Sequence, residues 1–204
     1  MTDTNSKRLD KRFFRREPTL VARELLGKRL VRNINGVRLA GLIVETEAYL
    51  GVLDKAAHSY GGRRTQRTEF MYGDGGTLYV FLNYGIHRLL NIVTDTTDVP
   101  TAVLIRAVEP TEGLELIRGF RPKTRNDHDL ASGPGKLGEA FQVQLAHNGI
   151  DLTHSDEWFV ERMKPRRSFK IETSSRIGVE YAEEWAHKQL RFYVSGNQHV
   201  SRGR

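Results

Sequence analysis

The chain contains no cysteine among its 204 residues. Disulfide bonds, thiolate nucleophiles and zinc or iron–sulfur sites built from cysteine are therefore excluded. Seven histidines remain, but none belongs to an H-x-x-x-H pair of the kind that binds a metal from a helix. We accordingly expect the protein to need no metal and no other cofactor.

Long apolar runs are also missing from the sequence. No stretch approaches the ~20 apolar residues that a membrane-spanning helix needs. The first residues, MTDTNSKRLDKR, lack the apolar segment of a secretory signal. We expect a soluble, intracellular protein with no membrane attachment.

Charge, by contrast, is strongly biased, with a formal net charge of +7 at pH 7. An excess of this size favours a polyanionic partner, either nucleic acid or an anionic membrane. The composition suits one core, so we expect a single domain over residues 13–204. The polar and basic residues 1–12 are expected to form a disordered tail.

The order of local patterns predicts an α+β domain with a curved, mainly antiparallel sheet and flanking helices. Asn35-Gly36 is a strong hairpin signal, and Tyr84-Gly85 occupies a similar position between two apolar stretches. Gly41, inside a long strand pattern, suggests a bulge. The predicted strands cover residues 29–33, 37–49, 77–83, 88–94, 101–108 and 190–194, and the predicted helices cover 18–26, 109–119 and 132–141.

Two carboxylates and an aromatic residue end the second predicted strand. Side chains alternate between the faces of a strand, so Glu45, Glu47 and Tyr49 should share one face. Paired carboxylates at such an edge suggest hydrolysis of a sugar bond. The alternative is a solvated strand face on which one glutamate pairs with an arginine.

Other residues suggest contact with an anion or with stacked bases. Arg106 lies beside apolar residues in a predicted strand and must find a carboxylate or a phosphate. Lys136 follows a Gly-Pro-Gly loop at a predicted helix start, where anions bind, although an ordinary solvated lysine fits equally well. Tyr84 lies at a hairpin tip, a position typical of side chains that insert into DNA.

Together, several motifs resemble the alkyladenine (3-methyladenine) DNA glycosylase family. They occur in the family's order and span nearly the whole chain from about residue 17. These motifs are I-V-E-T-E-A-Y-L-G at 43–51, A-A-H-S at 56–59, G-G-R-x-T-x-R at 61–67, G-T-L-Y-V at 76–80, Y-G at 84–85, L-I-R-A-V-E-P at 104–110, S-G-P-G-K-L at 132–137 and L-R-F-Y-V at 190–194.

The resemblance implies a role for individual residues. Glu47 would be the general base that activates water, and Arg106 would lie beside that water and a backbone phosphate. Asn91 would clash with the 2-amino group of normal guanine, and Tyr84 would be the wedge that fills the gap in the duplex. The base pocket would be walled by Tyr49, His58 and Phe81, and the DNA backbone would be held by Arg63, Arg64, Thr65, Arg67 and Lys136.

Phe81 departs from the vertebrate form of this motif, in which a tyrosine stands. The ring face is kept and the hydroxyl is lost, so stacking on a base should survive. A positively charged base should stack especially well on Tyr49 and Phe81 by cation–π attraction.

The activity implied is that of a monofunctional DNA glycosylase in base excision repair. It would flip alkylated or deaminated purines out of double-stranded DNA and hydrolyse the N-glycosidic bond, leaving an abasic site. The substrates would include 3-methyladenine, 7-methylguanine, hypoxanthine and ethenoadenine. The protein would act as a monomer without metal, in the cytoplasm at the nucleoid.

Two other functional classes remain open at this point. A nucleic-acid binding module without catalysis would use the same charge and aromatic residues, but it has no need of a carboxylate at position 47. A carbohydrate hydrolase could use Glu45 and Glu47 together, although both would lie on one side of the substrate and not flank its bond.

Overall fold

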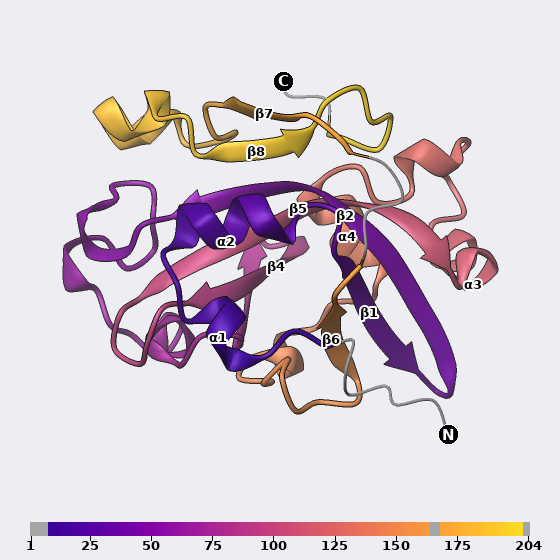
Figure 1. The fold of residues 1–204 in the computed structure, drawn as a ribbon, viewed down its shortest axis with the longest axis horizontal. Helices are drawn as coiled ribbons and strands as arrows, with labels where there is room; N and C mark the ends of the chain where they lie inside the picture. Colours follow the sequence, from indigo (N-terminus) through magenta and orange to yellow (C-terminus); the bar gives the residue numbers. More distant parts are fainter. Residues whose placement is uncertain (1–7, 164–167, 202–204) are drawn as a thin grey trace.

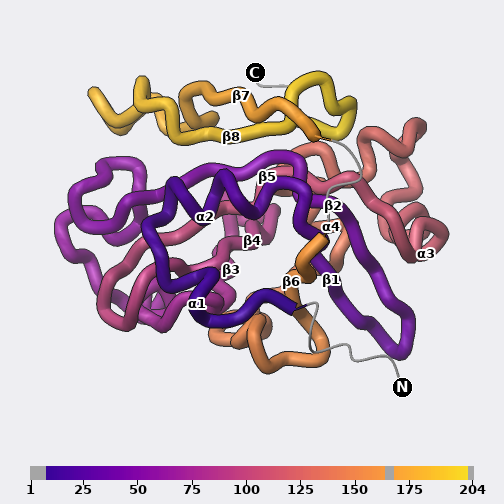
Figure 2. The backbone as a smooth tube through the Cα atoms, in the orientation of Figure 1, coloured from indigo at the N-terminus to yellow at the C-terminus, as the bar shows by residue number. Residues whose placement is uncertain are grey.

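In the computed structural model, residues 8–163 and 168–201 are described. One curled antiparallel sheet organises them, with strand order β3-β4-β5-β2-β1-β6 and with β7 and β8 attached through β2. Figures 1 and 2 show β7 and β8 running along one side of the molecule, next to β2. The strands are β1 (Arg29–Ile34), β2 (Val37–Tyr49), β3 (Leu78–Asn83), β4 (His87–Thr94), β5 (Thr101–Glu112), β6 (Trp158–Glu161), β7 (Ile171–Ser174) and β8 (Arg191–Val194).

The helices are short and lie against this sheet. α2 packs on β2 and β5, whereas α4 packs mainly on β4. The α-helices are α1 (Lys11–Phe14), α2 (Pro18–Leu25), α3 (Leu114–Phe120) and α4 (Pro134–Ala140). The 3₁₀ helices are Gly51–Leu53, Tyr60–Gly62, Glu69–Tyr72, Asp127–Asp129, Leu145–His147 and the kinked Glu180–His187. The predicted fold class, an α+β domain around a curved antiparallel sheet, is confirmed.

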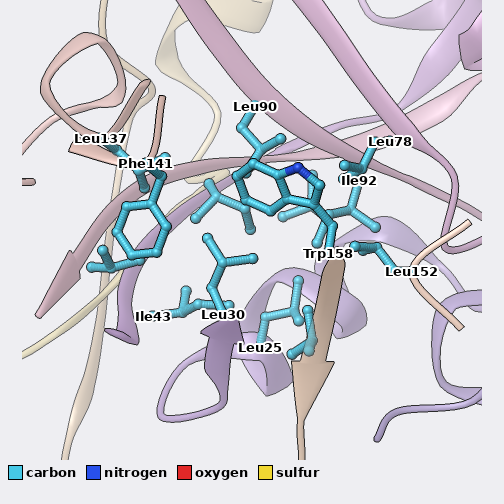
Figure 3. Close-up of a cluster of buried hydrophobic side chains, with 14 of the residues drawn as sticks. Leu25, Leu30, Ile43, Leu78, Leu90, Ile92, Leu137, Phe141, Leu152 and Trp158 are labelled. Atoms are coloured by element: carbon cyan, nitrogen blue, oxygen red, sulfur yellow. The ribbon is translucent and has the colours of Figure 1, made fainter. Parts of the chain in front are cut away.

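The largest hydrophobic core cluster lies between the sheet and the helices that pack on it, and includes Trp158. This residue of β6 is fully buried and stacks on Phe141, which follows α4, with ring centroids 6.5 Å apart. Figure 3 shows Leu25 of α2 and Leu137 of α4 in the same cluster. Both helices therefore help to close one core, which fixes the sheet that carries the site.

The turn and bulge signals of the sequence are confirmed. Asn35 and Gly36 both have positive φ, at 48° and 79°, as the tight β1–β2 hairpin turn requires. Tyr84 and Gly85 adopt the same kind of turn, with φ of 50° and 72°, between β3 and β4. The pairing of β2 with β5 shifts register at Gly41, and a Cβ there would lie 3.0 Å from the Glu109 carbonyl oxygen.

The helix predicted from residue 109 to 119 is wrong in its first half. β5 continues through Pro110 to Glu112, and α3 begins only at Leu114, after Gly113 with φ of 73°. Pro110 lies opposite Gly41, at the β2 bulge, where a proline does not disturb the ladder. The long partner strand thus overrides the local Glu-Pro-Thr signal.

The disordered tail predicted over residues 1–12 is wrong for residues 8–12. Leu9 is only 1% exposed, and its amide donates to the Val160 carbonyl oxygen. Asp10 caps α1 by accepting a hydrogen bond from the Phe13 amide. Residues 1–7 lie outside the described residues. The domain therefore begins earlier than its basic composition indicated.

Candidate active site

Side-chain alternation divides β2 into a core face and a site face. The Thr46 hydroxyl donates to the Ala22 carbonyl oxygen of α2 at 2.9 Å, and Ala48 packs into the core. Glu45, Glu47 and Tyr49 point the opposite way, as the sequence predicted. The site therefore lies on the face of the sheet turned away from α2.

A cavity of about 250 Å³ opens on this face. That is slightly below the ~300–1,000 Å³ typical of pockets for drug-sized ligands, so it suits one flat ring system. The strands supply alternate residues to its wall, while Ile177, Gly178, Val179 and Tyr181 cover one side. The predicted residues that line it are Tyr49, His58, Phe81, Tyr84, Asn91 and Arg106, together with Tyr79, Leu104 and others.

Glu47 lies directly behind this wall. Glu47 is 0% exposed and is not among the residues that line the cavity. Arg106 Nη1 lies 3.0 Å from Oε1, the Ile177 amide donates to Oε1 at 2.9 Å, and the Tyr49 hydroxyl donates to Oε2 at 2.9 Å. Because all three donor residues line the cavity, the carboxylate is one layer of atoms away from it.

Glu45 holds Arg106 from the other side. Arg106 Nε donates to Glu45 Oε1 at 2.7 Å, and Arg191 Nε donates to the same oxygen at 2.7 Å. The Ser201 amide donates to Oε2 at 2.7 Å. The two arginines lower the pKa of the fully buried Glu45 carboxyl despite its burial. The two glutamates and two arginines thus balance one another's charge, which allows all four to be buried.

His58 is neutral at physiological pH. Burial, together with nearby Arg67 and Arg63, lowers its pKa to about 4. Its Nδ1 lies 2.8 Å from the Tyr79 hydroxyl, and its ring meets Phe81 edge-on with centroids 4.4 Å apart. Burial raises the pKa of Tyr79 to about 12, so its hydroxyl stays protonated.

Asn91 is fixed by the backbone around it. Its amide nitrogen donates to the carbonyl oxygens of Tyr79 at 3.2 Å and Leu89 at 3.4 Å. The residue is 3% exposed and lines the cavity. It is therefore a rigid part of the wall, because a rotation of its amide would break both bonds.

Comparison with known proteins gives the family. The family described as Methylpurine-DNA glycosylase (MPG) matches residues 12–198. The chain belongs to the methylpurine-DNA glycosylase family. It is an enzyme, a DNA glycosylase that acts in DNA repair by hydrolysing N-glycosidic bonds.

Curated bacterial relatives carry the name "Putative 3-methyladenine DNA glycosylase". One from Clostridium perfringens is 45% identical over 203 residues, covering 96% of this chain and 99% of its own. One from Desulfitobacterium hafniense is 47% identical, covering 96% and 98%. One from Natranaerobius thermophilus is 44% identical, covering 95% and 98%. Among the described residues of this glycosylase, no helix has the length and apolarity that crossing a membrane requires.

The cations predicted to bind the DNA backbone differ in their surroundings in this glycosylase. Arg64 pairs with Glu69 at 2.7 Å and with Asp98 at 2.8 Å. Lys136 pairs with Asp129 at 2.9 Å. The other predicted contacts, Arg63, Thr65 and Arg67, are exposed on the loop before Glu69–Tyr72. Arg64 and Lys136 would have to exchange a carboxylate for a phosphate.

Sequence reasoning missed a buried ion pair in this glycosylase. Arg176 Nη1 and Nη2 donate to the two Asp54 oxygens at 2.6 and 2.8 Å, and both side chains are 0% exposed. The pair places Ile177 so that its amide reaches Glu47. Asp54 lies in the G-V-L-D-K stretch after a predicted strand, where a buried carboxylate could have been suspected. Arg176 lies in a polar stretch whose apolar residues show neither helical nor strand periodicity, so nothing pointed to it as the partner.

Proposed function

We propose that this glycosylase flips alkylated or deaminated purines out of duplex DNA and hydrolyses their bond to deoxyribose with a water activated by Glu47. The observation that carries the proposal is a base-sized cavity with Arg106 on its wall and Glu47 immediately behind. Tyr49 and Phe81 offer ring faces for a flipped base, and stacking on an aromatic ring contributes ~1–3 kcal/mol per base.

In the reaction, the bond between C1′ and the purine nitrogen breaks, and its electron pair leaves with the base. A cationic base departs neutral, whereas a neutral base must first gain a proton. The sugar becomes oxocarbenium-like, and a carboxylate stabilises that positive charge. The water oxygen bonds to C1′ and its proton passes to Glu47.

Access of a water to Glu47 requires a small movement of the cavity wall. Among the described residues, Oε2 accepts a hydrogen bond only from the Tyr49 hydroxyl, so it can accept a second one from the water while that hydroxyl holds it in place, whereas Oε1 contacts Arg106 and the Ile177 amide. The buried ion pair with Arg106 is compatible with catalysis because Arg106 keeps a second partner in Glu45.

Tyr84 is proposed as the wedge that occupies the space of the flipped base. It is 83% exposed, at the tip of the β3–β4 hairpin, and lies at the rim of the cavity. An exposed aromatic ring on a rigid turn can enter a base stack at little entropic cost.

The function is tested with duplex oligonucleotides that each carry one hypoxanthine, ethenoadenine or 7-methylguanine. After incubation, hot alkali cleaves the strand wherever a base has been released. Strand cleavage that requires the alkali step supports a monofunctional glycosylase. Cleavage without alkali, or no cleavage with any of the lesions, would contradict the proposal.

A further inference from the structure

An arginine lies over each of the two aromatic walls of the cavity. The guanidinium of Arg176 lies 4.7 Å from the ring centroid of Tyr49, and that of Arg67 lies 5.4 Å from the ring centroid of Phe81. Tyr49 and Phe81 line the base cavity, but neither arginine does. Phe81 also lines a neighbouring hollow that contains Arg67, so its ring separates Arg67 from the base cavity.

The two arginines differ in whether a carboxylate of the protein neutralises their positive charge. Arg176 is paired with Asp54 through two hydrogen bonds in the protein interior. Arg67 has no carboxylate within salt-bridge distance anywhere in residues 8–163 and 168–201; its Nη2 lies 3.5 Å from His58 Nε2, and its side chain also interacts with the Tyr79 hydroxyl. No carboxylate in the described part of the chain therefore neutralises the positive charge behind Phe81.

A cation on one face of a ring changes what the other face attracts. An aromatic face draws a cation through its electron-rich centre, and a guanidinium already placed there competes for the same density. Its charge also repels a second cation across the ring, since few solvent molecules lie between them. A neutral purine is not subject to this repulsion and still stacks.

We propose that Arg67 is a specificity-determining residue, which acts through Phe81 to disfavour positively charged purines and shift the site towards neutral lesions such as hypoxanthine. This inference rests on the function proposed above. It replaces the simpler expectation that both aromatic walls attract cationic bases. Arg67 also helps to keep His58 uncharged, so that residue adds no positive charge of its own to the wall.

The test compares two lesions in one duplex sequence. Single-turnover release of 7-methylguanine and of hypoxanthine is measured with the wild type and with Arg67→Gln. Any phosphate contact of Arg67 affects both substrates alike and cancels in the ratio. We expect the 7-methylguanine to hypoxanthine ratio to rise roughly two- to fivefold in the variant, the size of an exposed cation–π contact.

Arg63→Gln is the matched control, because it removes the same charge from the same exposed loop without lying over a ring. Its ratio should stay at the wild-type value. An unchanged or lowered ratio in Arg67→Gln overturns the inference, and so does an equal rise in both variants. Failure of the wild type to release either base would instead count against the proposed function.

Discussion

Tyr49 contributes two separable features to the site, a ring face towards the cavity and a hydroxyl bonded to Glu47 at 2.9 Å. Burial raises the pKa of this phenol well above 10, with the Glu47 charge as a further cause, so the hydroxyl remains a donor. The resemblance to known glycosylases suggested only the ring. The hydroxyl role requires the structure, because strand alternation places Tyr49 and Glu47 on one face but does not show that the phenol hydroxyl reaches the carboxylate.

Tyr49→Phe should therefore slow base release with little effect on binding of damaged DNA. A hydrogen bond to a charged group contributes about 1.5–3 kcal/mol, so the single-turnover rate should fall roughly 10- to 100-fold. Tyr79→Phe is the matched control, since it loses a hydroxyl bonded to His58. Equal rates for Tyr49→Phe and the wild type would show that the hydroxyl does not position the carboxylate.

His58 should make stability depend on pH. Its pKa is lowered from 6.5 in the unfolded chain to about 4 in the fold. Between these values the unfolded chain binds more protons, so stability is lost as pH falls from about 6.5 towards 4. Urea denaturation at pH 5 and pH 7.5 should show a smaller difference for His58→Gln than for the wild type. An identical difference in both proteins would refute the assignment.

At the scale of elements, hairpins were predictable and one strand–helix boundary was not. Asn35-Gly36 and Tyr84-Gly85 fix their turns by local backbone preference. β5 extends past Pro110 because β2, far away in sequence, offers it a partner. β6 and β7 were missed because each is a four-residue strand within a mainly polar stretch, whereas the equally short β8 stands out through its apolar L-R-F-Y-V pattern.

Two helical glycines should respond oppositely to alanine. A Cβ on Gly138 of α4 would lie 2.2 Å from the Arg88 carbonyl oxygen of β4, whereas a Cβ on Gly119 of α3 would meet nothing within 4 Å. Gly138→Ala should lose about 2 kcal/mol or more through overpacking. Gly119→Ala should gain about 0.5–1 kcal/mol in helix propensity. Urea denaturation measures both, and a neutral Gly138→Ala would contradict the α4–β4 packing.

For the whole molecule, the sequence predicted which residues gather at the cavity, but not which of them line it and which lie buried behind its wall. Tyr49, His58, Phe81, Asn91 and Arg106 do meet around one cavity. That Glu47 lies behind the wall, and that the segment after Arg176 covers it, depends on contacts between residues more than 120 positions apart. Such contacts leave no local signal in a single sequence.

The positive charge of the whole molecule should appear in the salt dependence of DNA binding. Arg63→Gln removes one exposed cation on the loop beside the cavity, so the slope of log affinity against log salt should fall by about 1. Arg23→Gln, on α2 at the opposite face of the sheet, should leave the slope unchanged. Binding titrations at several salt concentrations measure both slopes. Equal slopes for Arg63→Gln and the wild type would show that Arg63 does not contact a DNA phosphate.

The most direct test of the account is base release by Glu47→Gln. The amide keeps the size of the side chain, and its single oxygen can still accept from the Ile177 amide while its NH2 group faces the Tyr49 hydroxyl, but it carries no charge and is a far weaker base. Single-turnover release of hypoxanthine should fall at least about 1,000-fold, as when a general base and its charge are both lost, while the affinity for the lesion duplex stays near the wild-type value. Release at the wild-type rate by a folded Glu47→Gln protein would contradict the account.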